Sequence, residues 1–113
     1  MATRTPALAI IYAASALKEL DKIWDYNADL YASAEHATKY VDFLKTRINT
    51  LATDHARGKE VETNAGLRYI TMKRNPSGDG HAAVYRVKNK AVRIVHIFHT
   101  KQDWPSKVKA RKK

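Results

Sequence analysis

One stretch near the end of the chain constrains the fold more than any other, and it runs from Ala82 to Trp104. Two runs of β-branched and aromatic residues, 82–88 and 91–99, flank a short polar break within it. Alternation with a period of two on both sides of a two-residue turn is typical of a β-hairpin, and Asn89 tolerates the positive φ that such a turn requires. Because the second run is apolar on both faces, we predict that it lies inside a sheet covered on at least one side.

Strict alternation also predicts which side chains of the second run share a face of the sheet. One face would carry Val92, Ile94, His96 and Phe98, and the other Arg93, Val95, Ile97 and His99. On this pattern His96 is expected to be a hydrogen-bonded core histidine. The position of His99 at the end of the strand suits a functional role and a structural role equally well.

The part of the chain before this hairpin is expected to supply the layer that covers it. Apolar residues at spacings of three and four predict helices over residues 14–31 and 33–53, with Ser33 as the N-cap of the second. The short break between them predicts an antiparallel helical hairpin. Gly58 is expected to end that hairpin in a left-handed C-cap.

Two further strands are predicted, one over residues 6–12, opened by Pro6, and one over 67–74. A polar connection, 59–65, precedes the second of these, and residues 105–113 form a basic tail. The predicted order is therefore β-α-α-β-β-β in one domain of 113 residues. This is an α+β fold in which a helical hairpin packs on a small, mainly antiparallel sheet.

The net positive charge of the chain comes entirely from its second half. Up to Arg57 there are seven basic and seven acidic residues, whereas from Gly58 onward there are fourteen basic and four acidic residues, which accounts for the net charge of +10. Such an asymmetry implies an acidic partner, either a nucleic acid or an acidic protein.

Composition excludes several other classes of protein. The absence of cysteine excludes a disulfide scaffold and thiolate metal sites, and the histidines lack the spacing of metal ligands, so we expect no metal or other cofactor. No apolar run approaches the ~20 residues of a membrane-spanning helix. The start mimics a signal peptide weakly, with Arg4 before the apolar run 7–14, but the strand is favoured there and we expect a cytoplasmic protein.

This order of elements, with these residues, resembles the RelE/ParE superfamily of small bacterial toxins. The matching pieces are the helix ALKELDKIWDY, the strand opening Gly66-Leu67-Arg68 and the hairpin VYRVKNKAVRIVHIFHTKQDW. The resemblance covers Leu8 to Trp104, and the closing string His99-Thr100-Lys101-Gln102-Asp103 is closer to the ParE branch.

The resemblance implies the toxin of a type II toxin–antitoxin module, of the kind that stabilises plasmids, neutralised by a cognate antitoxin. A ParE-like toxin would bind DNA gyrase and trap it on cleaved DNA without chemistry of its own. A RelE-like toxin would instead be an endoribonuclease that cleaves mRNA on the ribosome. The alternative that carries no toxicity is a basic domain that binds nucleic acid.

The ParE-like interpretation places the contacts with target or antitoxin on basic side chains and one tryptophan. They are Arg68, Lys73, Arg74, Arg86, Arg93, Lys101 and Trp104. A ribonuclease needs a general acid or base close to cations. The sequence offers His99, His81, Arg86, Arg93, Lys73 and Tyr85, and of these His99, Arg86 and Arg93 are the preferred candidates. RelE-like enzymes typically carry an arginine three residues before the tyrosine of this hairpin, and Ala82 occupies that position here. Catalysis is therefore the less favoured of the two toxin mechanisms.

Overall fold

The computed structural model describes residues 7–61, 64–74, 78 and 80–101. The helices and strands, in chain order, are β1 (Ala9–Tyr12), α1 (Ala14–Tyr31), α2 (Ala34–Asn49), the 3-10 helix η1 (Thr50–Ala52), β2 (Lys59–Val61), β3 (Asn64–Met72), β4 (His81–Lys88) and β5 (Ala91–His99). In this part of the chain the strands form one sheet in the order β1-β5-β4-β3-β2. Strand β1 runs parallel to β5, and all other neighbours are antiparallel.

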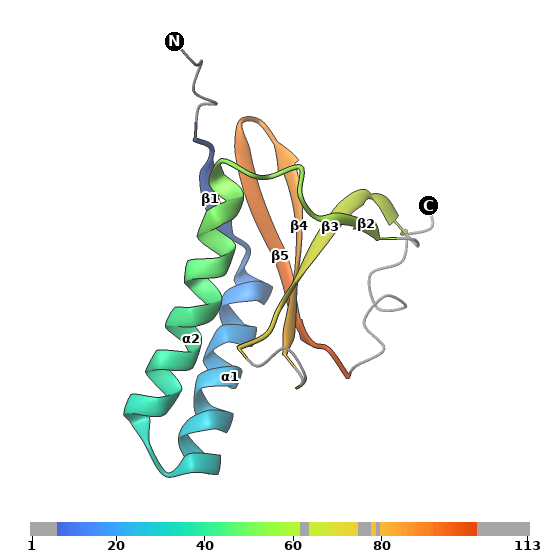
Figure 1. The fold of residues 1–113 in the computed structure, drawn as a ribbon. Helices are drawn as coiled ribbons and strands as arrows, with labels where there is room; N and C mark the ends of the chain where they lie inside the picture. The colour runs from blue at the N-terminus through green and yellow to red at the C-terminus, as the bar shows by residue number, and fades with distance from the viewer. Residues whose placement is uncertain (1–6, 62–63, 75–77, 79, 102–113) are drawn as a thin grey trace.

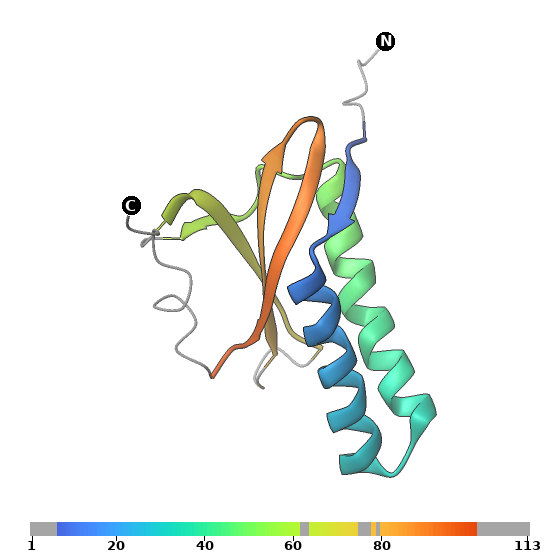
Figure 2. The same ribbon diagram turned by 180° about the vertical axis from the view of Figure 1, so that it is seen from behind.

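The two helices lie side by side against one face of this sheet (Figures 1 and 2). Their apolar stripes pack on side chains from β3, β4 and β5, which together form the main core. The Trp24 indole N–H donates to the Thr38 hydroxyl at 3.0 Å and so joins α1 to α2. The predicted α+β fold, a helical hairpin on a mainly antiparallel sheet, is confirmed, and β5 lies inside the sheet as expected.

The helical hairpin begins where predicted but ends differently. Ser33 is the N-cap of α2, and its hydroxyl accepts from the His36 backbone N–H at 3.1 Å. The α-helix stops at Asn49 and gives way to η1, so the predicted helix 33–53 is too long. The left-handed C-cap predicted at Gly58 is also wrong, since no described glycine has a positive φ. It is Ala32, at the end of α1, that adopts this conformation, with φ of 50°.

The predicted strands shift by a few residues, and one strand was missed. The strand expected over 6–12 is Ala9–Tyr12 among the described residues, and that expected over 67–74 is Asn64–Met72. The strand expected over 82–88 begins one residue earlier, while 91–99 agrees with β5. The strand that the sequence does not predict, β2, lies within residues 59–65, where a polar connection is expected. Its charged residues suit an edge strand, which needs no apolar alternation.

The turn between β4 and β5 consists of Asn89 and Lys90, whose φ values are 54° and 60°. Two consecutive residues with positive φ match the twist of the strands on either side, as in a type I′ hairpin. The two-residue turn fixes the register, so that Lys88 pairs with Ala91 and Arg86 with Arg93. This register brings two arginines directly opposite one another.

A β-bulge interrupts β5 and overturns the predicted alternation. Val84 pairs with His96 and Tyr85 with Ile94, which leaves Val95 as an extra residue. Beyond this point the two faces exchange, because one extra residue reverses every later side chain. Ile97 therefore joins the helix-facing core, and Phe98 packs against a smaller cluster on the opposite face.

The bulge also changes the expected role of His96. This residue is half-buried instead of lying in the core, and its ring stacks on that of Phe98 with centroids 5.2 Å apart. The prediction of a core histidine is therefore wrong, because it assumed alternation without interruption.

Candidate functional site

The face of the sheet away from the helices carries two of the predicted contact residues side by side. Arg86 on β4 and Arg93 on β5 are Cα partners. Their strand neighbours Tyr85, Val92 and Ile94 belong to the core beneath the helices, so both arginines project from the opposite face. Arg86 is exposed and Arg93 is partly exposed, and their role as contact residues stays a prediction.

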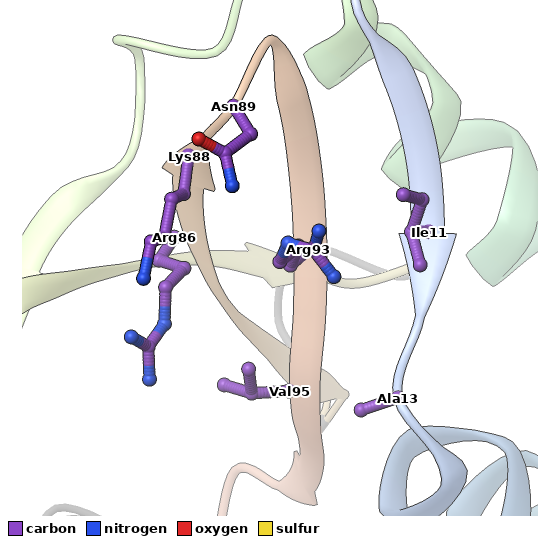
Figure 3. A pocket seen from close by; sticks show the side chains of 7 residues that line it. All are labelled: Ile11, Ala13, Arg86, Lys88, Asn89, Arg93 and Val95. Carbon is purple, nitrogen blue, oxygen red and sulfur yellow. The ribbon is translucent and has the colours of Figure 1, made fainter.

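The two arginines border a shallow depression of about 360 Å³ between β4, β5 and β1 (Figure 3). It is lined by Ile11, Ala13, Arg86, Lys88, Asn89, Arg93 and Val95, none of which is acidic. The ion pairs of the described chain join Lys22 to Glu19, Lys39 to Glu35 and Arg57 to Asp54. No described carboxylate pairs with the cations that line this depression, Arg86, Lys88 and Arg93. We call the depression with these three cations the open cationic face.

A second cluster lies on the helix-facing side, at the other end of the same strands. His81 and His99 are Cα partners, and their rings meet edge to face with centroids 5.1 Å apart. The Tyr40 hydroxyl lies 2.7 Å from Nδ1 of His81 and links this pair to α2. It is the bulge at Val95 that turns His99 toward the helices, since unbroken alternation would have placed it on the opposite face.

The environment of His81 keeps its imidazole neutral. Burial, with a further contribution from repulsion by His99, lowers the pKa of His81 from 6.5 to about 4. Burial raises the pKa of Tyr40, and the nearby Arg74 guanidinium partly opposes that rise. The backbone N–H of Lys101 donates to Nδ1 of His99 at 3.1 Å. The Tyr40 hydroxyl and the His81 imidazole are therefore uncharged at neutral pH and are held together by a hydrogen bond.

This cluster forms one wall of a groove of about 650 Å³ between the helical hairpin and the end of the sheet. The groove is lined by Glu19, Lys22, Ile23, Tyr26, Asn27, Leu30, Tyr31, His36, Tyr40, Arg74, His81, Ile97 and His99. Three large side chains on its α1 rim, those of Tyr26, Leu30 and Tyr31, are more than half exposed. Exposed apolar side chains gathered at the rim of a groove are typical of a binding site.

The structure does not bring the three candidate ribonuclease residues together. His99 faces the helices, whereas Arg86 and Arg93 project from the opposite face of the sheet. The position at which RelE-like enzymes carry an arginine, Ala82, is buried in the small second cluster. Tyr85 is fully buried, and its hydroxyl is committed to two hydrogen bonds with the backbone. The described residues also contain no group of three or more potential metal ligands.

The other predicted contact residues are scattered. The Arg68 guanidinium donates to the Gly58 carbonyl at 2.7 Å, so it supports the fold locally. Lys73 and Arg74 follow the end of β3, and the Arg74 guanidinium lies 5.9 Å from the centre of the Phe43 ring. Lys101 is exposed just after β5. Trp104 and the basic tail 105–113 lie outside the described residues.

The sequence indicates no functional role for Tyr40, which lines the groove and contacts His81. Its position in the sequence places it beside the apolar seam of the second helix, and no sequence signal shows that its hydroxyl reaches His81 across the fold. The sequence does indicate His81 as a candidate, because this histidine directly precedes the first strand of the predicted hairpin.

Comparisons with known proteins show which family and which folds this chain is similar to. The family model described as ParE toxin of type II toxin-antitoxin system, parDE, matches residues 10–104. A solved chain of the chromosomal ParDE TA system from P. aeruginosa superposes with a TM-score of 0.71 at 24% identity, covering 84% of this chain and 98% of that chain. A mutant of the E. coli toxin RelE in the free state gives a TM-score of 0.60 at 14% identity, covering 89% of this chain and 92% of that chain. A search of curated protein sequences found no match.

No described helix is both long enough and apolar enough to span a membrane.

Proposed function

The chain belongs to the ParE toxin family of type II toxin–antitoxin systems, and we propose that it inhibits DNA gyrase by binding it directly. The observation that carries this proposal is the open cationic face, where Arg86, Arg93 and Lys88 gather without a described carboxylate. An accessible surface of unpaired cations is suited to an acidic partner such as a complex of gyrase with DNA. This activity would take place in the cytoplasm.

The placement of the histidines supports binding in preference to RNA cleavage. A metal-free ribonuclease requires an acid or base and several cations around one phosphate. Here His99 and the arginine pair lie on opposite faces of the sheet. Among the other candidates, the Tyr85 hydroxyl is hydrogen-bonded to the backbone and the His81 ring to Tyr40.

We further propose that a cognate antitoxin neutralises the toxin at the groove beside α1. Tyr26, Leu30 and Tyr31 expose apolar surface there, and an amphipathic helix would bury it. The test is co-purification with the antitoxin encoded beside the toxin. Leu30→Arg is expected to abolish capture of the antitoxin while leaving action on gyrase intact. If Leu30→Arg captured as much antitoxin as the wild-type toxin does, the antitoxin would have to bind outside this groove.

The proposed target can be tested with purified components. The toxin is added to gyrase and relaxed plasmid, and supercoiling is followed as the toxin concentration rises. We expect loss of supercoiling with the wild-type protein and with Lys45→Glu, a charge reversal on the exposed side of α2. Full supercoiling at excess toxin would contradict the proposal.

A translation reaction supplies the matching test for ribonuclease activity. Primer extension on a translated mRNA is expected to show no new 5′ ends in the presence of toxin. Cuts in the ribosomal A-site that disappear with His99→Ala would instead establish the RelE-like activity.

A further inference from the structure

The end of the β4–β5 hairpin has a composition unlike the rest of the described sheet. Residues 86–93 read RVKNKAVR, with four cations among eight residues and no acidic residue. All four cationic residues lie on the two strands or on the turn that joins them. We call this segment the basic hairpin end.

The arrangement of these cations is unfavourable unless an anion is bound. Arg86 and Arg93 are direct cross-strand partners, and like charges in that position repel one another. Figure 3 shows Arg86 and Lys88 projecting from β4 beside Arg93 on β5. No described carboxylate pairs with any of the three, and the depression between them has only apolar or amide side chains as its other lining. A bound anion would relieve this repulsion.

The character of the lining indicates which kind of anion fits. The depression contains no aromatic side chain. Protein interfaces rely on aromatic anchors for much of their binding energy, and single-stranded nucleic acids are held by aromatic stacking. Binding to the phosphates of a duplex requires no aromatic side chain, and arginine binds phosphate through two parallel hydrogen bonds.

The shape of the segment also suits duplex DNA. A two-stranded β-ribbon fits the major groove of B-DNA, whereas the major groove of an RNA duplex is too deep and narrow for side chains to read. At the tip of the ribbon the exposed Asn89 offers an amide that could hydrogen-bond to a base edge.

We propose that the basic hairpin end binds the phosphate backbone of duplex DNA, with Arg86 and Arg93 as the principal contacts. In the setting of the proposed function, on which this last step rests, the toxin would hold gyrase through contacts that include the DNA on which gyrase acts. Binding to DNA alone requires no gyrase, so the two proposals can fail separately.

The experiment measures fluorescence anisotropy of a labelled 24-base-pair DNA duplex titrated with the full-length protein at several salt concentrations. Wild type is compared with the double variant Arg86→Gln, Arg93→Gln, and with the control Lys18→Gln, Lys45→Gln, which removes the same charge from the helical side. The basic tail is unchanged in all three proteins, so it contributes equally. Thermal melts establish that each variant is folded.

We expect the hairpin variant to bind the duplex at least about tenfold more weakly, and its plot of log affinity against log salt to be shallower by about 2. The control variant is expected to bind within about twofold of wild type. A competing single strand of the same length is expected to displace the duplex poorly.

Three outcomes would overturn the inference. Equal loss of affinity in the hairpin and control variants would mean that only net charge matters. Tighter binding of the single strand would exclude duplex recognition. Binding of a polyglutamate peptide through Arg86 and Arg93, with no binding of the duplex, would make this surface a protein-binding site.

Discussion

The Tyr85 hydroxyl accepts a hydrogen bond from the Gly58 backbone N–H at 3.0 Å, across 27 residues of sequence. The same hydroxyl donates to the His55 carbonyl at 2.7 Å. Tyr85 thereby anchors the segment between the helical hairpin and β2 to the centre of the sheet. A Cβ at residue 58 would collide with the Tyr85 ring, so the close approach requires glycine.

This relationship predicts a structural cost for Tyr85→Phe. The ring volume is kept, but the buried Gly58 N–H and the His55 carbonyl both lose a partner, which should lower the free energy of unfolding by about 1–3 kcal/mol. Urea denaturation measures the change, with Tyr26→Phe on the exposed rim of α1 as a control that should shift by less than about 0.5 kcal/mol. An unchanged stability in Tyr85→Phe would show that these hydrogen bonds contribute nothing.

A pH dependence of stability follows from the lowered pKa of His81. The folded pKa is about 4 and the unfolded value 6.5, so between these values the unfolded chain binds more protons. The protein therefore has its full stability above about pH 6.5, and its free energy of unfolding decreases as the pH falls toward 4. After discounting for partial exposure, we expect this group to contribute about 1–2 kcal/mol of that loss.

His81→Gln isolates this contribution when urea unfolding is measured at pH 7 and at pH 4.5. The variant should lose less stability on acidification than wild type does. His36→Gln is the control, because His36 lines the same groove but lies on α2 against the ring of Tyr31. Parallel pH profiles for wild type and His81→Gln would exclude His81 as the source.

The left-handed conformation of Ala32 predicts a stabilising substitution. Its φ of 50° and ψ of 42° place it at the C-cap of α1, where glycine avoids the steric penalty of a Cβ. Ala32→Gly should raise the free energy of unfolding by about 1 kcal/mol. Ala28→Gly, in the interior of the same helix, should lower it by a similar amount. Destabilisation by both would mean that Ala32 is not strained.

Much of the fold follows from local patterns in the sequence. The apolar spacing of the helices, the N-cap at Ser33 and the alternation of 91–99 all act over a few residues and predicted their elements well. Two main features of the sheet escaped prediction. The bulge at Val95 is one extra valine among many apolar residues, so composition carries no sign of it. The strand β2 is charged and forms through pairing with β3, which its own residues do not signal.

The candidate sites also combine features that local sequence determines with features that depend on tertiary packing. The pairing of Arg86 with Arg93 follows from the two-residue turn, because the turn alone sets the register of the hairpin. The contact of Tyr40 with His81 depends on how α2 packs against the sheet, and the position of His99 depends on the bulge. Neither is encoded in neighbouring residues, so both required the three-dimensional structure.

The yield of plasmid DNA trapped as a gyrase-linked cleavage product, measured against toxin concentration, most directly tests whether this toxin poisons gyrase through its open cationic face. We predict that trapped linear DNA rises with wild-type toxin and with Lys45→Glu, and stays at background with the double variant Arg86→Glu, Arg93→Glu, provided that all three proteins are folded. No trapped DNA at excess wild-type toxin, or equal trapping by the double variant, would contradict this mechanism.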